Sequence, residues 1–147
     1  MFSSFMSQAV DAAKKGAALG EVPIGALIVH KGAVIAQAHN ETRLRPDATA
    51  HAEILAIQRA ARVLGQERLE GCDLYVTLEP CAMCAGAIGH ARIRRLYFGA
   101  SDPKSGGVLH GAQVFDHAQS HHKPEVYPGI YEAACAALLT EFFAERR

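Results

Sequence analysis

Two cysteines separated by two residues carry the clearest chemical pattern in the sequence, Pro80-Cys81-Ala82-Met83-Cys84. Two thiolates at this spacing can bind one tetrahedral zinc ion, and the positive end of a helix beginning here would favour their ionised forms. The pair alone is also compatible with a redox disulfide or with half of a structural four-ligand zinc site. Cys72 and Cys135 have no partner at ligand spacing, so we interpret each as a buried small apolar residue.

The third candidate ligand is His51, in the run Thr49-Ala50-His51-Ala52-Glu53. Alone, a histidine or a glutamate in the first turn of a helix is usually a surface residue. Together with the two cysteines, His51 makes a set of three ligands and leaves the fourth zinc position open for water, which is typical of a catalytic site. Glu53 follows two residues later and can reach that water as general base without binding the metal. The H-x-E and P-C-x-x-C pair resembles the signature of the zinc deaminases.

This arrangement predicts hydrolytic deamination of a nucleobase with one Zn²⁺ per subunit. Two thiolates cancel the formal charge of zinc and weaken it as a Lewis acid, so a second group that takes the proton of water is useful. Glu53 would then pass protons first to a ring nitrogen and later to the departing ammonia.

Composition bounds the chain to a single domain, residues 1–147, with 50% hydrophobic residues. Lys+Arg and Asp+Glu are both 15, giving a net charge of zero, whereas a sequence-blind nucleic-acid binder is usually basic. The chain has no apolar run of transmembrane length, and residues 1–10 lack the basic start and continuous apolar stretch that are expected of a secretory signal. We therefore expect a cytoplasmic protein without a membrane span.

Hydrophobic spacing predicts the elements that must position these residues. Helices are expected at Ser4–Leu19, Ala50–Leu64 (capped by Thr49), Ala82–Ala91 and Tyr131–Arg147. Strands are expected at Val22–His30, Ala33–Ala38, Asp73–Leu78, Ile93–Gly99 and Pro124–Tyr127. A long loop, Ala100 to Lys123, precedes the fifth strand. This alternation predicts an α/β fold with three layers, α/β/α, built on a single mixed five-stranded sheet.

Beyond the zinc motif, nearly the whole chain resembles the cytidine/deoxycytidylate deaminase superfamily, and within it the bacterial tRNA-specific adenosine deaminases. The similar segments are Gly20–Ala26 (G-E-V-P-I-G-A), Asn40 eleven residues before His51, Leu74–Gly86 (L-Y-V-T-L-E-P-C-A-M-C-A-G), Ala91–Ile93, Phe98–Lys104 (F-G-A-S-D-P-K), Cys135–Leu139 and Phe142-Phe143.

The resemblance implies a cytidine deaminase-like fold and conversion of adenosine to inosine at the wobble position of a tRNA anticodon. It also implies a homodimer in which both subunits meet the anticodon stem-loop. The implied substrate contacts are Asn40 to the base or ribose, the Ala52 backbone to the base, Val22 and Pro23 lining its pocket, Asp102 to the sugars, and His121, His122 and Phe143 to the anticodon loop.

Each implied contact has a plainer alternative. Asn40 could cap a turn, Asp102 before Pro103 could start one, Phe143 could belong to the core, and the loop histidines could be solvated. The segment Ser105–Gly111 (S-G-G-V-L-H-G) also departs from the commoner T-G-A-A-G-S run, and His121 stands where many members carry asparagine.

Two further features of the sequence bear on RNA and on a second subunit. Basic residues that could contact phosphates, or simply form a scattered solvated surface, are Arg43, Arg45, Lys104, Lys123, Arg146 and Arg147. The small residues Ala85, Gly86 and Gly89 would allow close approach of a second subunit, or equally packing onto the sheet.

Two other functions are compatible with the same motifs. One is a deaminase of a free base or nucleoside, such as guanine, cytosine or cytidine. The other, from a different class, is a non-catalytic zinc- or RNA-binding module. Glu53 argues against the second, because a purely structural site has no use for that carboxylate.

Overall fold

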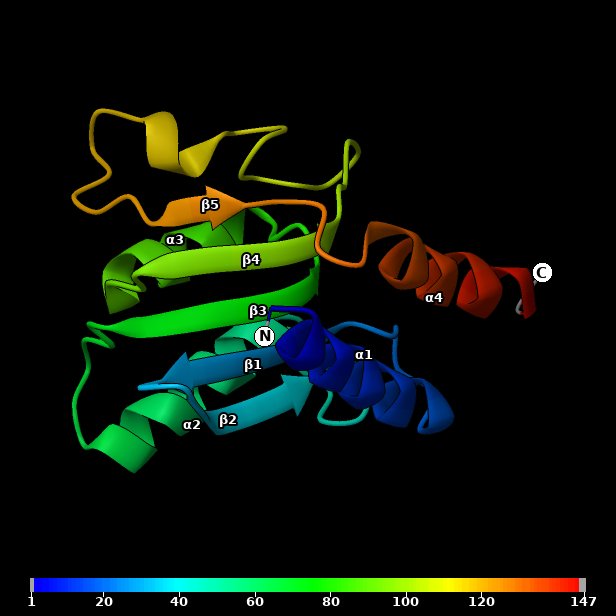
Figure 1. Ribbon diagram of the computed structural model, residues 1–147. Helices are drawn as coiled ribbons and strands as arrows, with labels where there is room; N and C mark the ends of the chain where they lie inside the picture. Colours follow the sequence, from blue (N-terminus) through cyan, green and yellow to red (C-terminus); the bar gives the residue numbers. More distant parts are fainter. Residues whose placement is uncertain (1, 146–147) are drawn as a thin grey trace.

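A single five-stranded sheet forms the centre of the molecule, in the order β2-β1-β3-β4-β5 (Figure 1). The computed structural model describes residues 2–145, with side chains from residue 5 onward. The strands are β1 (Gly25–His30), β2 (Ala33–His39), β3 (Cys72–Leu78), β4 (Arg95–Ala100) and β5 (Glu125–Tyr127). β1 is antiparallel to both of its neighbours, whereas β3, β4 and β5 are parallel. The predicted single mixed five-stranded α/β sheet is therefore confirmed.

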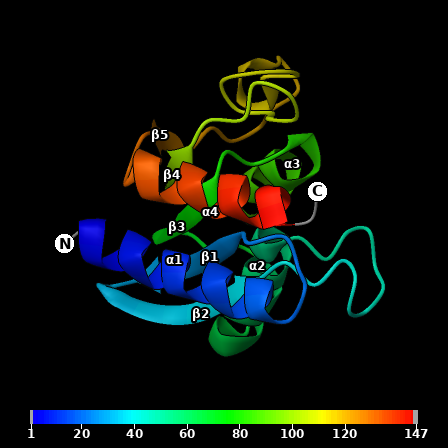
Figure 2. The same cartoon turned by 90° about the vertical axis from the view of Figure 1, so that its right-hand side faces the viewer.

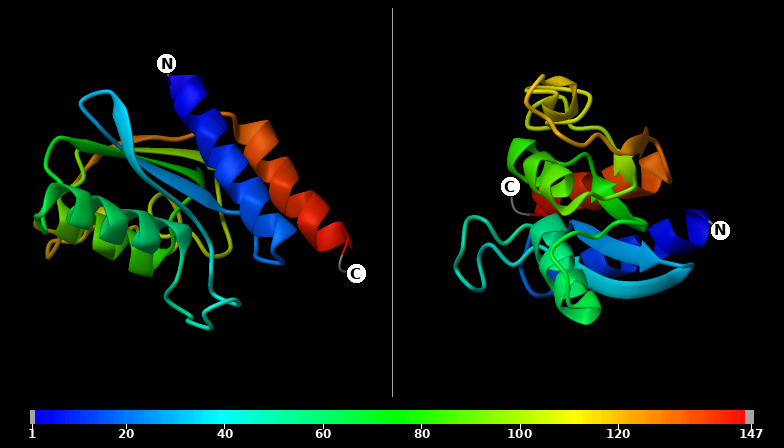
Figure 3. Two further views of the ribbon diagram at one scale, coloured as in Figure 1. Left: turned by 90° about the horizontal axis from the view of Figure 1, so that it is seen from below. Right: turned by 90° about the vertical axis from the view of Figure 1, so that its left-hand side faces the viewer.

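Four helices cover the two faces of this sheet. α2 (Ala52–Leu64) and α3 (Ala82–Ala91) lie on one face, and α1 (Phe2–Ala18) and α4 (Glu132–Glu145) lie side by side on the other (Figures 2 and 3). Side chains alternate accordingly along β1: Ile28 packs in the core beneath α2 and α3, and Leu27 packs in the core beneath α1. No helix in the range 2–145 is long and apolar enough to cross a membrane.

Helix α2 begins two residues later than predicted, and Thr49 does not cap it. The Thr49 N–H and Oγ1 both donate to Asp47 Oδ1, at 2.8 and 2.6 Å. Asp47 thus closes a local turn, a role that competes with capping. His51 is the N-cap instead.

Other boundaries shift for local reasons. β1 begins at Gly25 instead of Val22, because Val22 to Ile24 forms a tight turn in which the Ile24 N–H donates to the Val22 carbonyl at 2.8 Å. Gly25 itself lies against α1, where a β-carbon would collide with the Ala9 carbonyl.

The remaining boundaries agree closely with the prediction. α3 has the predicted bounds, β4 starts two residues late, and a short 3₁₀ helix, Val114–Asp116, lies inside the predicted loop. α4 is described to Glu145, so the last two residues of the predicted helix lie outside the described part.

Candidate active site

Two helices begin at the same point of the molecule, with candidate metal ligands as their N-caps. His51 precedes α2 with φ −73° and ψ 151°, and Cys81 precedes α3 with φ −71° and ψ 175°. Neither side chain makes the usual capping hydrogen bond to its own helix. The imidazole and the thiol are therefore available to each other, and both lie at the positive end of a helix dipole.

The three predicted ligands form one compact group. His51 Nδ1 lies 3.6 Å from Cys81 Sγ and 3.5 Å from Cys84 Sγ, and all three ligand atoms lie within 4.8 Å of one another. In tetrahedral zinc coordination, with Zn–N and Zn–S bonds of about 2.05 and 2.3 Å, nitrogen and sulfur ligands are about 3.6 Å apart. Both the donor set and the spacing fit this ion. Within residues 2–145, no other histidine, cysteine and carboxylate group of three or more has such a geometry.

The thiols of this group differ in acidity. A hydrogen bond from Cys84 lowers the pKa of Cys81 to about 4, and a hydrogen bond from His51 adds to the effect. The reciprocal bond to Cys81, together with burial, raises the pKa of Cys84. The Cys81 interaction also raises the pKa of His51. Cys81 therefore carries negative charge at neutral pH, as a metal-ligating thiolate requires.

Glu53 lies in the first turn of α2, two residues after His51, and only 4% of it is exposed. Burial raises the pKa of its carboxyl group to about 7 against opposing effects of its own backbone N–H and of His51. A carboxyl group with a pKa near neutrality can both accept and return a proton at physiological pH. Its environment thus fits the predicted acid and base role.

Asn40 and Ala52 are brought into contact beside this group. The Asn40 Oδ1 accepts the Ala52 N–H at 2.9 Å, and the Asn40 N–H donates to the Ile24 carbonyl at 3.1 Å. The second bond places the turn containing Val22 and Pro23 next to Asn40. Val22 is half-buried and Pro23 is buried. These four predicted substrate residues therefore lie near the start of α2.

Asp102 starts a turn, as the alternative to a substrate contact predicts. Its Oδ1 accepts the Ser105 N–H at 3.0 Å, and its carbonyl accepts the Gly106 N–H at 2.8 Å. The side chain is half-exposed. The same segment touches the cysteine motif, since the Gly107 N–H donates to the Pro80 carbonyl at 2.8 Å.

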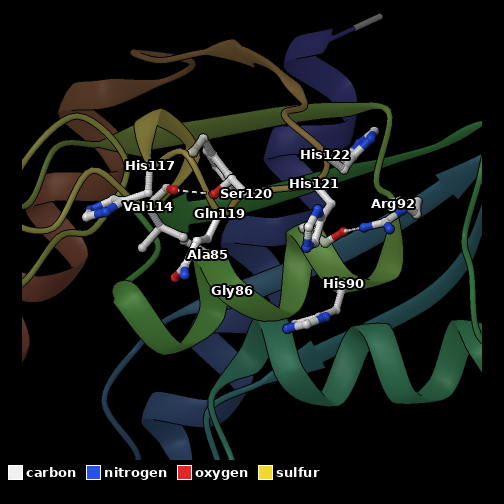
Figure 4. Close-up of a pocket in the computed structure, with 12 residues that line it drawn as sticks. Ala85, Gly86, His90, Arg92, Val114, His117, Gln119, Ser120, His121 and His122 are labelled. Carbon is white, nitrogen blue, oxygen red and sulfur yellow. Dashed lines mark hydrogen bonds between the residues drawn. The ribbon is translucent and has the colours of Figure 1, made fainter.

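His121 and His122 do not join the metal group. They line a cavity of about 340 Å³ between α3 and the loop that leads to β5, close to Arg92 at the far end of α3 (Figure 4). His122 Nε2 lies 2.6 Å from the Ile93 carbonyl, and His121 is exposed. Their predicted contact with an anticodon loop would therefore use a surface at the opposite end of α3 from Cys81.

Phe143 is 46% exposed, so the alternative that it belongs to the core is wrong. Its neighbour Phe142 is the buried member of the pair, and the two rings meet edge to face at 5.3 Å. The Arg43 guanidinium lies 5.9 Å from the Phe142 ring centre, which connects the loop before α2 to the end of α4.

The basic residues proposed for phosphate contacts are distributed over exposed loops. Arg43, Arg45, Lys104 and Lys123 are exposed. Arg45 pairs with Glu41 at 3.1 Å and Lys123 with Asp116 at 2.9 Å. Arg146 and Arg147 lie outside the described residues.

Two buried carboxylates, Glu21 and Glu79, support the loops around the site and were not anticipated from the sequence. Glu21 accepts the backbone N–H of Arg43 at 3.1 Å and that of Leu44 at 2.7 Å. Burial raises the pKa of Glu79, but hydrogen bonds from the Asp102 backbone and the His110 ring outweigh it and leave the pKa below its usual value. The signal available in the sequence is that each acid lies within a segment similar to the family, Gly20–Ala26 or Leu74–Gly86.

Comparison with known proteins identifies the family. The family model described as MafB19-like deaminase matches residues 2–147. A tRNA-specific adenosine deaminase of Agrobacterium fabrum is 54% identical over 143 residues, covering 97% of this chain and 94% of that protein. Its Bacillus subtilis counterpart is 46% identical over 145 residues, covering 97% and 89%.

Solved structures agree with this assignment. A structure from work on A-to-I editing by tRNA:A34 deaminases at the wobble position of transfer RNA has a TM-score of 0.91 and 54% identity, covering 92% of this chain and 99% of that one. Guanine deaminase from Bacillus subtilis has a TM-score of 0.68 and 33% identity, covering 97% and 92%. The chain therefore belongs to the MafB19-like deaminase family, and the relatives from Agrobacterium fabrum and Bacillus subtilis at 54% and 46% identity are tRNA-specific adenosine deaminases.

Proposed function

We propose that this protein hydrolyses adenosine to inosine at the wobble position of a tRNA anticodon, with one zinc ion per subunit. The observation that carries the proposal is the His51, Cys81 and Cys84 group with the buried Glu53 beside it, in a chain 54% identical to a tRNA-specific adenosine deaminase. A zinc ion held by these three side chains would lower the pKa of water and so supply a nucleophile at neutral pH.

The proton transfers fall to Glu53. Its carboxylate takes one proton from water while the oxygen bonds to the carbon that carries the exocyclic amine, and it gives that proton to the adjacent ring nitrogen. It then carries the proton of the new hydroxyl group to the amine, the C–N bond breaks and ammonia leaves. Water is consumed, inosine and ammonia form, and Glu53 ends as it began. Burial of Glu53 favours this cycle because its pKa, about 7, lies close to the working pH.

Asn40 is proposed to bind the base or ribose through Nδ2, since its Oδ1 already accepts the Ala52 N–H. This bond also fixes the first peptide of α2, and with it the position of His51. We assign the neighbouring Val22 and Pro23 to the wall of the base pocket. Asp102, His121, His122 and Phe143 are proposed for the surrounding RNA, and their exposure or half-exposure supports this role.

We further propose that the protein acts in the cytoplasm as a homodimer. Ala85 of α3 packs into the core, whereas a β-carbon at Gly86 would meet open space. The outer side of α3 is therefore free of large side chains at Gly86 and could admit a second helix closely. Light scattering of the zinc-loaded protein at micromolar concentration tests this state, with twice the 15.7 kDa chain mass expected.

The activity is tested with zinc-loaded protein and a tRNA that carries adenosine at the wobble position. Digestion to nucleosides is expected to yield inosine. Glu53→Ala is expected to keep the fold and the zinc content but to lose at least about 10²-fold in turnover, because proton transfer by a positioned side chain typically contributes that much. Glu67→Ala, on an exposed acid, is the matched control. Normal turnover by Glu53→Ala would contradict the proton-transfer role.

A further inference from the structure

The atypical segment Ser105–Gly111 has a specific structural partner, the carboxylate of Glu79. Only 2% of Glu79 is exposed. Its Oε2 accepts the backbone N–H groups of Val108, Leu109 and His110 at 3.2, 2.9 and 3.1 Å. Its Oε1 accepts the Asp102 N–H at 3.0 Å and lies 2.7 Å from His110 Nδ1. A buried charge is tolerated only with such partners, so the loop folds around this carboxylate.

The same loop lies directly on the cysteine motif. A β-carbon on Gly107 would lie 2.5 Å from Ala82 N and 2.8 Å from Cys81 C, and one on Gly106 would lie 2.5 Å from Glu79 Oε2. In this chain, a β-carbon at either position would force its neighbours to shift. Since Glu79 is two residues before Cys81, its carboxylate joins the Asp102–His110 loop to the peptide that holds the metal ligand.

The His110 ring is the side-chain part of this arrangement. Half-buried at the edge of the loop, it donates from Nδ1 to Glu79 Oε1. The hydrogen bonds from the backbone N–H groups of residues 108–110 to Glu79 hold that stretch of the loop in place. The bond from the His110 ring to Glu79 restricts the end of the loop from a second direction. The His110 ring and the Asp102 N–H both bond to Oε1 of Glu79. A displacement of the ring would therefore alter the hydrogen bond that holds Asp102.

We propose that Glu79 and His110 are positioning residues of the deaminase site. Glu79 clamps the Asp102–His110 loop onto the Cys81 peptide, and the His110 ring closes the clamp, so that Asp102 keeps a fixed place beside the metal centre. The consequence for the substrate rests on the proposed tRNA activity. Glu79 and His110 are expected to affect RNA binding more than the chemical step, because neither residue is a metal ligand or the proton carrier.

The decisive variants are His110→Ala and His110→Asn. The asparagine amide can place an N–H donor near the position of His Nδ1, whereas alanine removes the donor. His30→Ala is the matched control, since His30 lies at the opposite end of β1 from the site. Glu79→Gln replaces one accepting oxygen with a donor and opposes the N–H groups of the loop.

Two readouts are measured on the zinc-loaded proteins, well below their unfolding temperatures. The first is steady-state kinetics on an anticodon stem-loop RNA. His110→Ala is expected to raise KM about tenfold, the effect of one hydrogen bond to a charged group, with kcat within about twofold. His110→Asn is expected to restore most of this loss. An unchanged KM in His110→Ala, or no rescue by asparagine, would overturn the proposal.

The second readout needs no substrate. Amide hydrogen exchange over 102–110 is expected to be faster in His110→Ala and Glu79→Gln, with zinc content and exchange of α3 unchanged. Unchanged exchange in both variants would overturn the clamp. A wild-type protein that forms no inosine would contradict the proposed function instead, and the exchange comparison would still decide the clamp.

Discussion

His51 and Cys81 occupy helix positions where serine, threonine, aspartate or asparagine is usual, because the short polar side chains of those residues accept a backbone N–H. Neither His51 nor Cys81 makes that bond. Each helix therefore begins without a stabilisation of typically about 1 kcal/mol, and the two side chains face each other instead. At these two positions, the side chains that could bind a metal replace side chains that would stabilise the start of the helix.

This trade is testable at His51. His51→Asn is expected to raise the free energy of unfolding of the metal-free protein by about 1 kcal/mol, because asparagine can cap α2, while abolishing zinc retention and turnover. Urea unfolding and metal analysis measure the two effects. His30→Asn, inside a strand, is the control and should give no gain. A destabilised His51→Asn protein would argue against the capping account.

The acidity of Glu53 predicts the pH dependence of the reaction. Burial raises its pKa to about 7, so below that pH the group is increasingly protonated and cannot accept a proton from water. kcat is therefore expected to fall about tenfold per pH unit on the acid side. A metal cation favours the carboxylate, so the acid limb of the loaded enzyme lies at or below this value.

The profile is measured from pH 5 to 9 with zinc content determined at each point, which separates loss of metal from protonation of Glu53. A kcat that rises as the pH falls, or an acid limb well above pH 7 with zinc retained, would contradict this role.

At the scale of elements, the site depends on loops folded around buried carboxylates. Glu79 holds the segment from Asp102 to His110 against α3, and Glu21 holds the backbone of Arg43 and Leu44 in the loop before α2. Both loops border the start of the helices that carry the ligands. Their geometry follows from backbone N–H groups that need an acceptor once water is excluded.

Close approach of one loop to α3 leaves no room for a β-carbon at Gly107 in this chain. Gly107→Ala is expected to destabilise the protein by about 1–3 kcal/mol and to weaken zinc retention, because the new β-carbon displaces the Cys81–Ala82 peptide. Gly89→Ala is the matched control: its nearest contact would be an ordinary 3.6 Å, and alanine favours a helix interior. Thermal unfolding and metal analysis compare the two. Equal zinc retention would contradict the packing argument.

The elements were largely predictable because their apolar periodicity is regular, as the agreement over Ala82–Ala91 shows. The start of α2 was not, because Thr49 satisfies a capping pattern but bonds to Asp47. The grouping of His51, Cys81 and Cys84 was predictable from their residue types and spacing. The roles of Glu21 and Glu79 were not predictable, because the sequence does not distinguish a buried glutamate from an exposed one. The backbone N–H groups that bond to a buried carboxylate are brought to it only by the tertiary structure.

At the scale of the whole molecule, the site lies where the antiparallel and parallel halves of the sheet meet. β3 belongs to both halves, and α3 follows it directly, with Glu79, Pro80 and Cys81 between them. The chain has no net charge, so attraction of RNA over long range is weak and recognition depends on local contacts. The exposed loop that carries Arg43 and Arg45 lies next to the start of α2 and offers one such basic surface.

The most direct test of the central claim offers the zinc-loaded protein four substrates separately: a tRNA with adenosine at the wobble position, the same tRNA with guanosine there, free adenosine and free guanine. Nucleoside analysis and ammonia release are measured for each. Inosine is expected in the first tRNA alone, at the wobble position, with no comparable ammonia release from the other three. Rapid ammonia release from guanine without inosine in the tRNA would contradict the assignment and favour a free-base deaminase.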